Sequence, residues 1–254
     1  MIPAPVQRAF NEVRAGFLIL TRIPVGRIGG AVPGMAASAW TWPLVGLVVG
    51  GMAAVVHSAA LWLGLPLPVA AVLALLTATM ATGALHEDGL ADLCDGFGGG
   101  RDRARRLEIM RDSRIGSYGA LALGFSLLIR VMALSSLTGS TGALALVGLA
   151  AVSRAPLPAA LWLMPPARPD GLGRAAVGVE ARRSLLALGL GVGLFALCLP
   201  ASTWFALPVM ALAALALGWL AMERIGGQTG DVLGAMQMVT ELAGWLCLST
   251  LIQQ

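Results

Sequence analysis

The chain has 254 residues, of which 57% are hydrophobic and only 12% are charged, and its mean hydropathy is +0.83. Because a soluble domain carries about 25% charged residues, this composition excludes an ordinary soluble enzyme and predicts a polytopic membrane protein. The net charge of +4 does not indicate nucleic-acid binding, because the arginines alternate with acids and no basic aromatic stripe accompanies them.

The N-terminal region predicts an amphipathic helix. Phe10, Val13, Phe17 and Leu20 share one face of that helix, and polar residues lie between them. Two placements are open: the helix lies in the membrane interface, or it packs under the bundle. A break at Arg22 then separates this helix from the first apolar run.

Seven apolar runs are long enough to cross the hydrocarbon core, which takes about 20 residues of helix. They cover residues 40–63, 66–85, 117–137, 143–164, 184–200, 203–222 and 232–252. The fifth run is short and rich in glycine. Together they predict an all-α fold, a polytopic membrane helical bundle of about seven transmembrane helices that forms a single integral membrane domain over residues 1–254.

The arginines predict the orientation of this bundle. Segments 1–39, 86–116, 165–183 and 223–231 would lie on one side of the membrane, and they hold fifteen of the seventeen arginines. The connections on the other side hold no charge at all. Because cytoplasmic loops are rich in arginine and lysine, the N-terminus is predicted to be cytoplasmic and the C-terminus to lie outside.

The cytoplasmic segment 86–116 is the predicted catalytic region. Asp88, Asp92 and Asp95 are spaced i, i+4, i+7, which places three carboxylates on one helix face. Like charges so close repel each other, and Mg²⁺ prefers carboxylate oxygens, so a metal site is the natural interpretation. His86 at the start of the stripe is a candidate base. The alternative is a solvated face of a cytoplasmic helix.

Two features follow the stripe. Gly96 and the glycines at 98–100 predict a loop whose N–H groups approach a phosphate, or else a plain turn between helices. Residues 101–116 predict an amphipathic cytoplasmic helix. In its last turn, Arg111 and Arg114 are candidates for holding phosphate with their guanidinium groups, and Asp112 is a candidate to complete the metal site.

Charged residues inside the predicted spans are costly and therefore mark function. Arg130, Arg154 and Glu241 lie in the middle of the third, fourth and seventh runs. Either they pair with one another, or Arg154 faces a polar cavity. Gln228 and Asp231 lie at the cytoplasmic start of the last run. Either Asp231 only caps the helix, or this segment forms a joint site with the acidic stripe.

These motifs resemble one known family. HEDGLADLCDG at residues 86–96, LEIMRDSRIGSYG at 107–119 and GGQTGD at 226–231 are similar to the cobalamin synthases, or adenosylcobinamide-GDP ribazoletransferases, and LTRIPV at 20–25 and AVSR at 151–154 fit as well. The resemblance implies a multi-pass enzyme of the bacterial inner membrane that acts late in vitamin B12 nucleotide-loop assembly, with its active site facing the cytoplasm. Such an enzyme joins α-ribazole, or its 5′-phosphate, to adenosylcobinamide-GDP and releases GMP with the help of Mg²⁺.

A working hypothesis distributes the roles. The carboxylates would bind one or two Mg²⁺ ions that bridge the pyrophosphate, and an aspartate or His86 would act as base. The predicted catalytic residues are Asp88, Asp92, Asp95 and His86. The predicted metal ligands are Asp88, Asp92, Asp95 and Asp112. The predicted substrate-binding residues are Arg22, Arg111, Arg114, Arg154, Gln228 and Asp231.

Two other functions compete with this hypothesis. A CDP-alcohol-type phosphotransferase also uses aspartates at the ends of membrane helices, but the Ala-Arg and the second aspartate pair of its motif are absent. A small transporter would place Arg130, Arg154 and Glu241 along a path, but the acids cluster on one membrane face and no inverted repeat is evident. The expected partners are the two substrates and the lipid bilayer, with no nucleic acid. A homo-oligomer and association with other enzymes of the pathway are both left open.

Overall fold

The apolar runs fold as helices joined by short turns in the computed structural model, which describes residues 4–137 and 140–251. No β-strand occurs in these ranges. The elements are α1 (Ala4–Leu20), α2 (Met35–Ser38), η1 (Ala39–Thr41), α3 (Trp42–Trp62), α4 (Leu67–Thr82), α5 (Leu85–Gly99), α6 (Arg103–Ile109), α7 (Ser117–Ser136), α8 (Thr141–Val152), α9 (Leu157–Leu163), α10 (Gly171–Ala175), α11 (Ala181–Cys198), η2 (Ala201–Thr203), α12 (Ala206–Ile225) and α13 (Gly230–Leu251).

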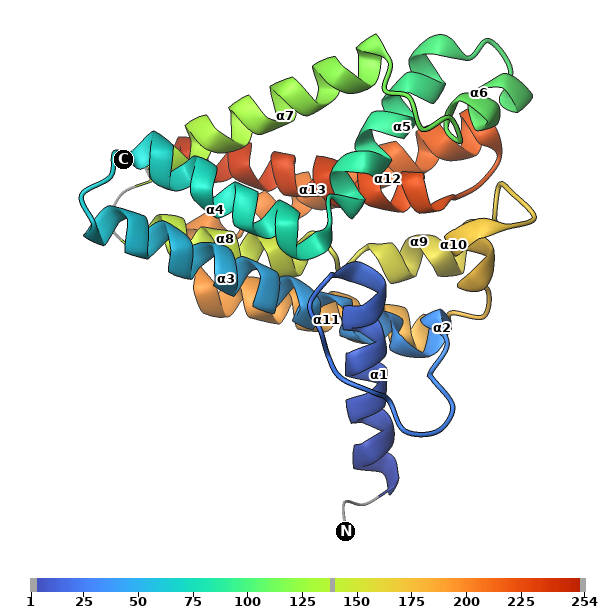
Figure 1. Ribbon diagram of the computed structural model, residues 1–254, viewed down its shortest axis with the longest axis horizontal. Helices are drawn as coiled ribbons and strands as arrows, with labels where there is room; N and C mark the ends of the chain where they lie inside the picture. Colours follow the sequence, from blue (N-terminus) through green and yellow to red (C-terminus); the bar gives the residue numbers. More distant parts are fainter. Residues whose placement is uncertain (1–3, 138–139, 252–254) are drawn as a thin grey trace.

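The predicted membrane bundle is confirmed. Within the described residues, six helical stretches are long and apolar enough to cross a membrane, and a seventh is added if α4 and α5 count as one bent span. The long helices lie side by side, and the C-terminus is at the end of the bundle opposite to α5, α6 and α10 (Figure 1). The charged segments therefore gather at one end. The extreme ends of the predicted domain, 1–3 and 252–254, lie outside the described residues.

The N-terminal helix forms as predicted. α1 lies across the bundle and its N-terminal end points away from it (Figure 1). The apolar face is unevenly covered, since Phe10 is 56% exposed whereas Leu20 at the other end is buried. The buried Glu12 fastens α1 to the bundle by accepting a hydrogen bond of 2.7 Å from the indole N–H of Trp40 and by pairing with Arg183 at 3.5 Å.

Two local predictions need correction. The glycines at 96–99 are part of α5, which ends only at Gly99, so no phosphate-cradling loop exists there. The helix predicted over 101–116 is limited to the seven residues of α6, because the chain turns at Met110. The fourth predicted span forms as one stretch, Thr141–Leu163, in which a short turn ending at Pro156 joins α8 to α9.

A sharp corner joins the second span to the acidic stripe. α4 and α5 meet at 88°, with two residues between them. Both have left-handed backbone angles: Gly83 at φ +65°, which glycine adopts freely, and Ala84 at φ +60°, which a residue with a Cβ rarely adopts. The acidic stripe thus starts on a helix whose direction this corner sets.

Candidate functional site

The candidate site is built where α5 crosses the start of α13. The two helices touch backbone to backbone at Gly89 and Gly234: a Cβ added to Gly89 would lie 2.9 Å from the carbonyl oxygen of Asp231 and 3.1 Å from the Gly234 Cα. Only glycine permits so close an approach. The crossing brings the predicted stripe and the GGQTGD segment together, as the hypothesis of a joint site requires.

Three carboxylates from the two helices form the centre of the site. Asp88, Asp231 and Asp95 are neighbouring like charges of Asp92, and Arg168 is the neighbouring cation. Arg168 pairs with Asp231, with 3.3 Å between Nη1 and Oδ2. Arg168 could not be predicted from the sequence, because it lies between prolines in a loop and no spacing relates it to an aspartate 63 positions later.

Hydrogen bonds of the buried Gln228 hold the turn between α12 and α13 in place next to these carboxylates. Gln228, 1% exposed, donates from Nε2 to the carbonyl of Gly173 at 3.1 Å, and its backbone exchanges two hydrogen bonds of 2.8 Å with Pro165 and Ala167. Thr229 caps α13, since its Oγ1 accepts from the backbone N–H of Val232. Gln228 is therefore a structural residue here, and Asp231 does not cap the helix but pairs with Arg168 instead.

α6 is fixed over the same turn by arginines. Arg103 donates from Nε to the carbonyl of Ile225 at 2.7 Å and from Nη2 to that of Ala167 at 2.8 Å. Arg168 in turn donates to the carbonyl of Leu107 at 3.1 Å. The segments 103–109, 165–175 and 225–231 thus form one connected frame around the carboxylates, although they are far apart in the sequence.

Asp95 is engaged with the start of α7. It is buried, and its two carboxylate oxygens accept hydrogen bonds from the backbone N–H groups of Gly116, at 2.7 Å, and Gly119, at 2.9 Å. These are donors in the first turn of α7 that lack helical partners, and a carboxylate is the preferred acceptor there. Asp95 thus fastens α7 to α5, while it is also a neighbouring like charge of Asp92. Its catalytic and metal-binding roles stay predictions.

His86 and Arg154 are also turned away from the predicted site. His86 is 3% exposed, and its neighbouring charges are the buried Arg154 and Arg130. Arg154, likewise 3% exposed, donates to the carbonyl of Ala150 at 2.7 Å and has Glu241 as its main anionic neighbour. Both side chains belong to a polar cluster inside the bundle, so neither the phosphate contact predicted for Arg154 nor the base predicted for His86 is supported.

Three predicted site residues that follow α6 form ion pairs at the surface. Arg111 lies 2.5 Å from Asp170, and Arg114 lies 2.6 Å from Asp112. The hydrogen bonds from Arg114 lower the pKa of Asp112 to about 2, and Asp112 in turn raises the pKa of Arg114. Asp112 is not among the charges that neighbour Asp92, which gives no support to a shared metal site. Arg111 and Arg114 remain predicted phosphate ligands.

Arg22 lies on the same groove as Asp88. It lines a groove of about 370 Å³ together with Gly83 and Asp88, and its side chain covers the corner between α4 and α5. Its backbone N–H donates to the carbonyl of Ala81 at 2.8 Å, which fastens the N-terminal segment to the corner. This groove is the place where a phosphate could contact a guanidinium and approach Asp88 at the same time.

The carboxylates of the site suit a hard cation such as Mg²⁺ that is bound partly by the protein and partly by the substrate. In residues 4–137 and 140–251, no three His, Cys, Asp or Glu side chains are close enough to hold a metal ion by themselves. Mg²⁺, however, is usually bound by one or two carboxylates, and substrate phosphates and water complete its shell. Asp88, Asp92 and Asp231 provide such carboxylates.

Comparison with known proteins gives consistent results along the whole chain. Residues 12–249 match the family model described as cobalamin-5-phosphate synthase. A protein of Mesorhizobium japonicum named adenosylcobinamide-GDP ribazoletransferase is 44% identical over 96% of this chain and 94% of its own length. A protein of the same name from Bradyrhizobium diazoefficiens is 43% identical over 95% of this chain and 95% of its own length. Another from Xanthobacter autotrophicus is 48% identical over 82% of this chain and 82% of its own length. No solved structure matches the chain.

Proposed function

The chain belongs to the cobalamin-5-phosphate synthase family, and we propose that the carboxylates at the crossing of α5 and α13 are its active site. The protein is a membrane enzyme of cobalamin biosynthesis, a ribazoletransferase that acts on adenosylcobinamide-GDP. In the proposed reaction the acceptor is α-ribazole or its 5′-phosphate, and the leaving group is GMP. The observation that carries the proposal is the convergence of Asp88, Asp92 and Asp231 beside Arg168.

The proposed chemistry is an exchange at one phosphorus atom. A ribose hydroxyl of ribazole attacks the phosphorus that carries cobinamide, a new P–O bond forms, and the P–O bond to GMP breaks. Arg22 binds phosphate oxygens from the groove beside Asp88. The proton of the attacking hydroxyl passes to an aspartate of the cluster, which is favoured over His86 because His86 is buried. Mg²⁺, held by one or two of Asp88, Asp92 and Asp231 together with the substrate, would neutralise charge at the pyrophosphate.

We propose further that the enzyme lies in the bacterial inner membrane with this end of the bundle in the cytoplasm. The support is the distribution of arginine: fifteen of the seventeen lie in the segments predicted to be cytoplasmic, and these include the frame around the carboxylates. Charged corrinoid and nucleotide substrates would reach the site from that side without crossing the hydrocarbon core.

The test is a transfer assay on the purified protein in detergent. Adenosylcobinamide-GDP is incubated with α-ribazole or with α-ribazole 5′-phosphate, with and without Mg²⁺, and GMP and the corrinoid product are quantified by mass spectrometry. Asp92→Asn is expected to lower product formation by more than about a hundredfold. Glu108→Gln is the matched control, because Glu108 is an exposed carboxylate of α6 whose ion pair is with Arg105, a surface residue of the same helix. Near-normal turnover of Asp92→Asn would refute the assignment of the site.

A further inference from the structure

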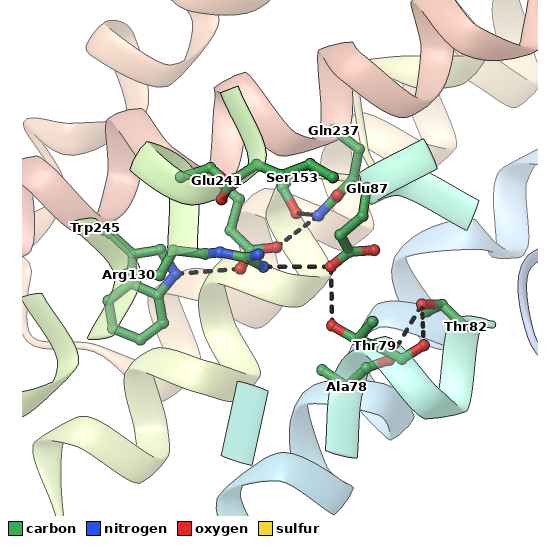
Figure 2. Close-up of polar contacts among 11 residues, drawn as sticks. Ala78, Thr79, Thr82, Glu87, Arg130, Ser153, Gln237, Glu241 and Trp245 are labelled. Atoms are coloured by element: carbon green, nitrogen blue, oxygen red, sulfur yellow. Dashed lines mark hydrogen bonds and ion pairs between the residues drawn. The ribbon is translucent and has the colours of Figure 1, made fainter. Parts of the chain in front are cut away.

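Glu87 is the neighbour of Asp88 in the first turn of α5, yet it points in a different direction. Successive residues of a helix are rotated by about 100°, so Glu87 faces the bundle while Asp88 is exposed at the groove. Figure 2 shows the Glu87 carboxylate between Thr79 and Arg130. The Thr79 hydroxyl donates to Oε1 at 3.0 Å, and Arg130 Nη1 lies 3.5 Å from the same oxygen.

This contact joins three helices at the corner. Thr79 is in the last turn of α4, Glu87 is in the first turn of α5, and Arg130 is in the middle of α7. The Thr79–Glu87 hydrogen bond therefore spans the two arms of the 88° bend, and Arg130 fixes that bend to a third helix. Pairing of Arg130 within the set of Arg154 and Glu241 was one of two predicted arrangements, but the carboxylate partner of Arg130 is Glu87.

The charges of this cluster balance each other inside the bundle. The side chains of Arg130 and Glu87 are 6% and 16% exposed. Deeper in the bundle, Glu241 accepts hydrogen bonds from Gln237 at 2.6 Å and from Trp245 at 3.1 Å, and Arg154 is its cationic neighbour (Figure 2). Two arginines thus face two carboxylates around a cavity of about 30 Å³. Such groups are costly to bury, so their presence calls for a role.

The corner needs support from outside its own backbone. Ala84 has a left-handed backbone conformation that an alanine adopts only at a cost, and such a conformation persists where surrounding contacts hold it. The same turn positions the active-site carboxylates, because the backbone N–H of Asp88 donates to the Ala84 carbonyl at 2.8 Å. A change in the angle at Ala84 would move Asp88 and Asp92 relative to Asp231 on α13.

We propose that Glu87 is a positioning residue for ribazole transfer. Through Thr79 and Arg130 it fixes the angle between α4 and α5, and this angle determines where Asp88 and Asp92 stand opposite Asp231. Glu87 touches no substrate in this role. The inference rests on the proposed function, since it assumes that these carboxylates are the active site.

The first test is Glu87→Gln in the transfer assay, with Glu108→Gln as the matched control. Glutamine keeps an oxygen for Thr79 but loses the charge that faces Arg130. A misplacement of about 1 Å at an active site can lower turnover about a hundredfold. We therefore expect kcat to fall about ten- to a hundredfold, whereas KM for adenosylcobinamide-GDP changes less than about threefold. An unchanged kcat would overturn the proposal.

A second variant separates positioning from charge balance. Glu87→Gln combined with Arg130→Gln leaves no unpaired buried charge, so the yield of folded protein and its Tm should recover. Because the fixed corner is not restored, kcat should stay low. Recovery of kcat to near the wild-type value would show that the pair only neutralises charge, and would overturn the proposal. An inactive wild-type protein would instead count against the proposed function, so the two failures are distinguishable.

Discussion

The contact between α5 and α13 leads to a sharp prediction at Gly89. In Gly89→Ala the new Cβ would lie 2.9 Å from the Asp231 carbonyl oxygen and 3.1 Å from the Gly234 Cα, whereas ordinary contacts of a Cβ are 3.4–4 Å. Since the atoms it meets are backbone, the helices must move apart by about 0.5–1 Å. That movement separates Asp88 and Asp92 from Asp231.

The expected effect of Gly89→Ala is larger on activity than on stability. Overpacking a helix contact typically costs about 1–3 kcal/mol, which a bundle of this size can tolerate. A shift of this size at the carboxylates should lower kcat by about ten- to a hundredfold. The assay measures GMP release together with Tm in the same detergent.

Gly124→Ala is the matched control, since Gly124 lies inside α7 and a Cβ there would meet nothing within 4 Å. Alanine in that helix should be neutral or stabilise it by up to about 1 kcal/mol, without loss of turnover. A Gly89→Ala enzyme as active as Gly124→Ala would refute the idea that the crossing holds the site together.

Three further predictions follow from individual contacts. Asp95→Ala should lower the free energy of unfolding by about 2–3 kcal/mol, because two backbone N–H groups at the start of α7 lose their acceptor; a Tm equal to that of the wild type would contradict this. Arg168→Gln should raise KM or lower kcat at least about tenfold by releasing Asp231, and an unchanged kcat/KM would exclude such a role. Arg114 lowers the pKa of Asp112 to about 2, so the stabilisation from this ion pair is complete above about pH 4 and is lost only as the pH falls towards 2. The difference in Tm between the wild type and Asp112→Asn should therefore be constant from pH 5 to 9. A difference that varies over this range would contradict the ion pair between Arg114 and Asp112.

The sequence predicted the fold class well because the insertion of a helix into a membrane depends on the summed hydropathy of about 20 consecutive residues. Seven apolar runs were expected, and helices occupy all seven of these places. The second run differs from a straight spanning helix, because α4 has only 16 residues and the chain bends after it at Gly83 and Ala84. Apolar composition cannot reveal such a corner, since the backbone angles that make it depend on contacts with other helices.

The site was predicted in part. Helical spacing predicted that Asp88 and Asp92 share one face, and the two are neighbouring charges in the structure. The membrane side that the arginine distribution assigns to the stripe and Asp231 stays a prediction. Spacing alone also selected Asp95, which shares that face but lies against the start of α7. Helical periodicity gives the face of the helix on which a side chain lies, but it does not identify which residues of other helices that side chain contacts.

By itself, the amino-acid sequence determined that this protein is a helical membrane protein and a member of a ribazoletransferase family, because hydropathy and motifs are local and are read directly from the residues. Only the tertiary structure decided which polar residues meet. It joined Arg168 to Asp231 across 63 positions and enclosed Arg154 within the bundle. It also paired Glu87 with Arg130 beside the corner. The physical reason is that charge pairing in a bundle depends on how helices cross, and two glycines and one 88° bend set that crossing here.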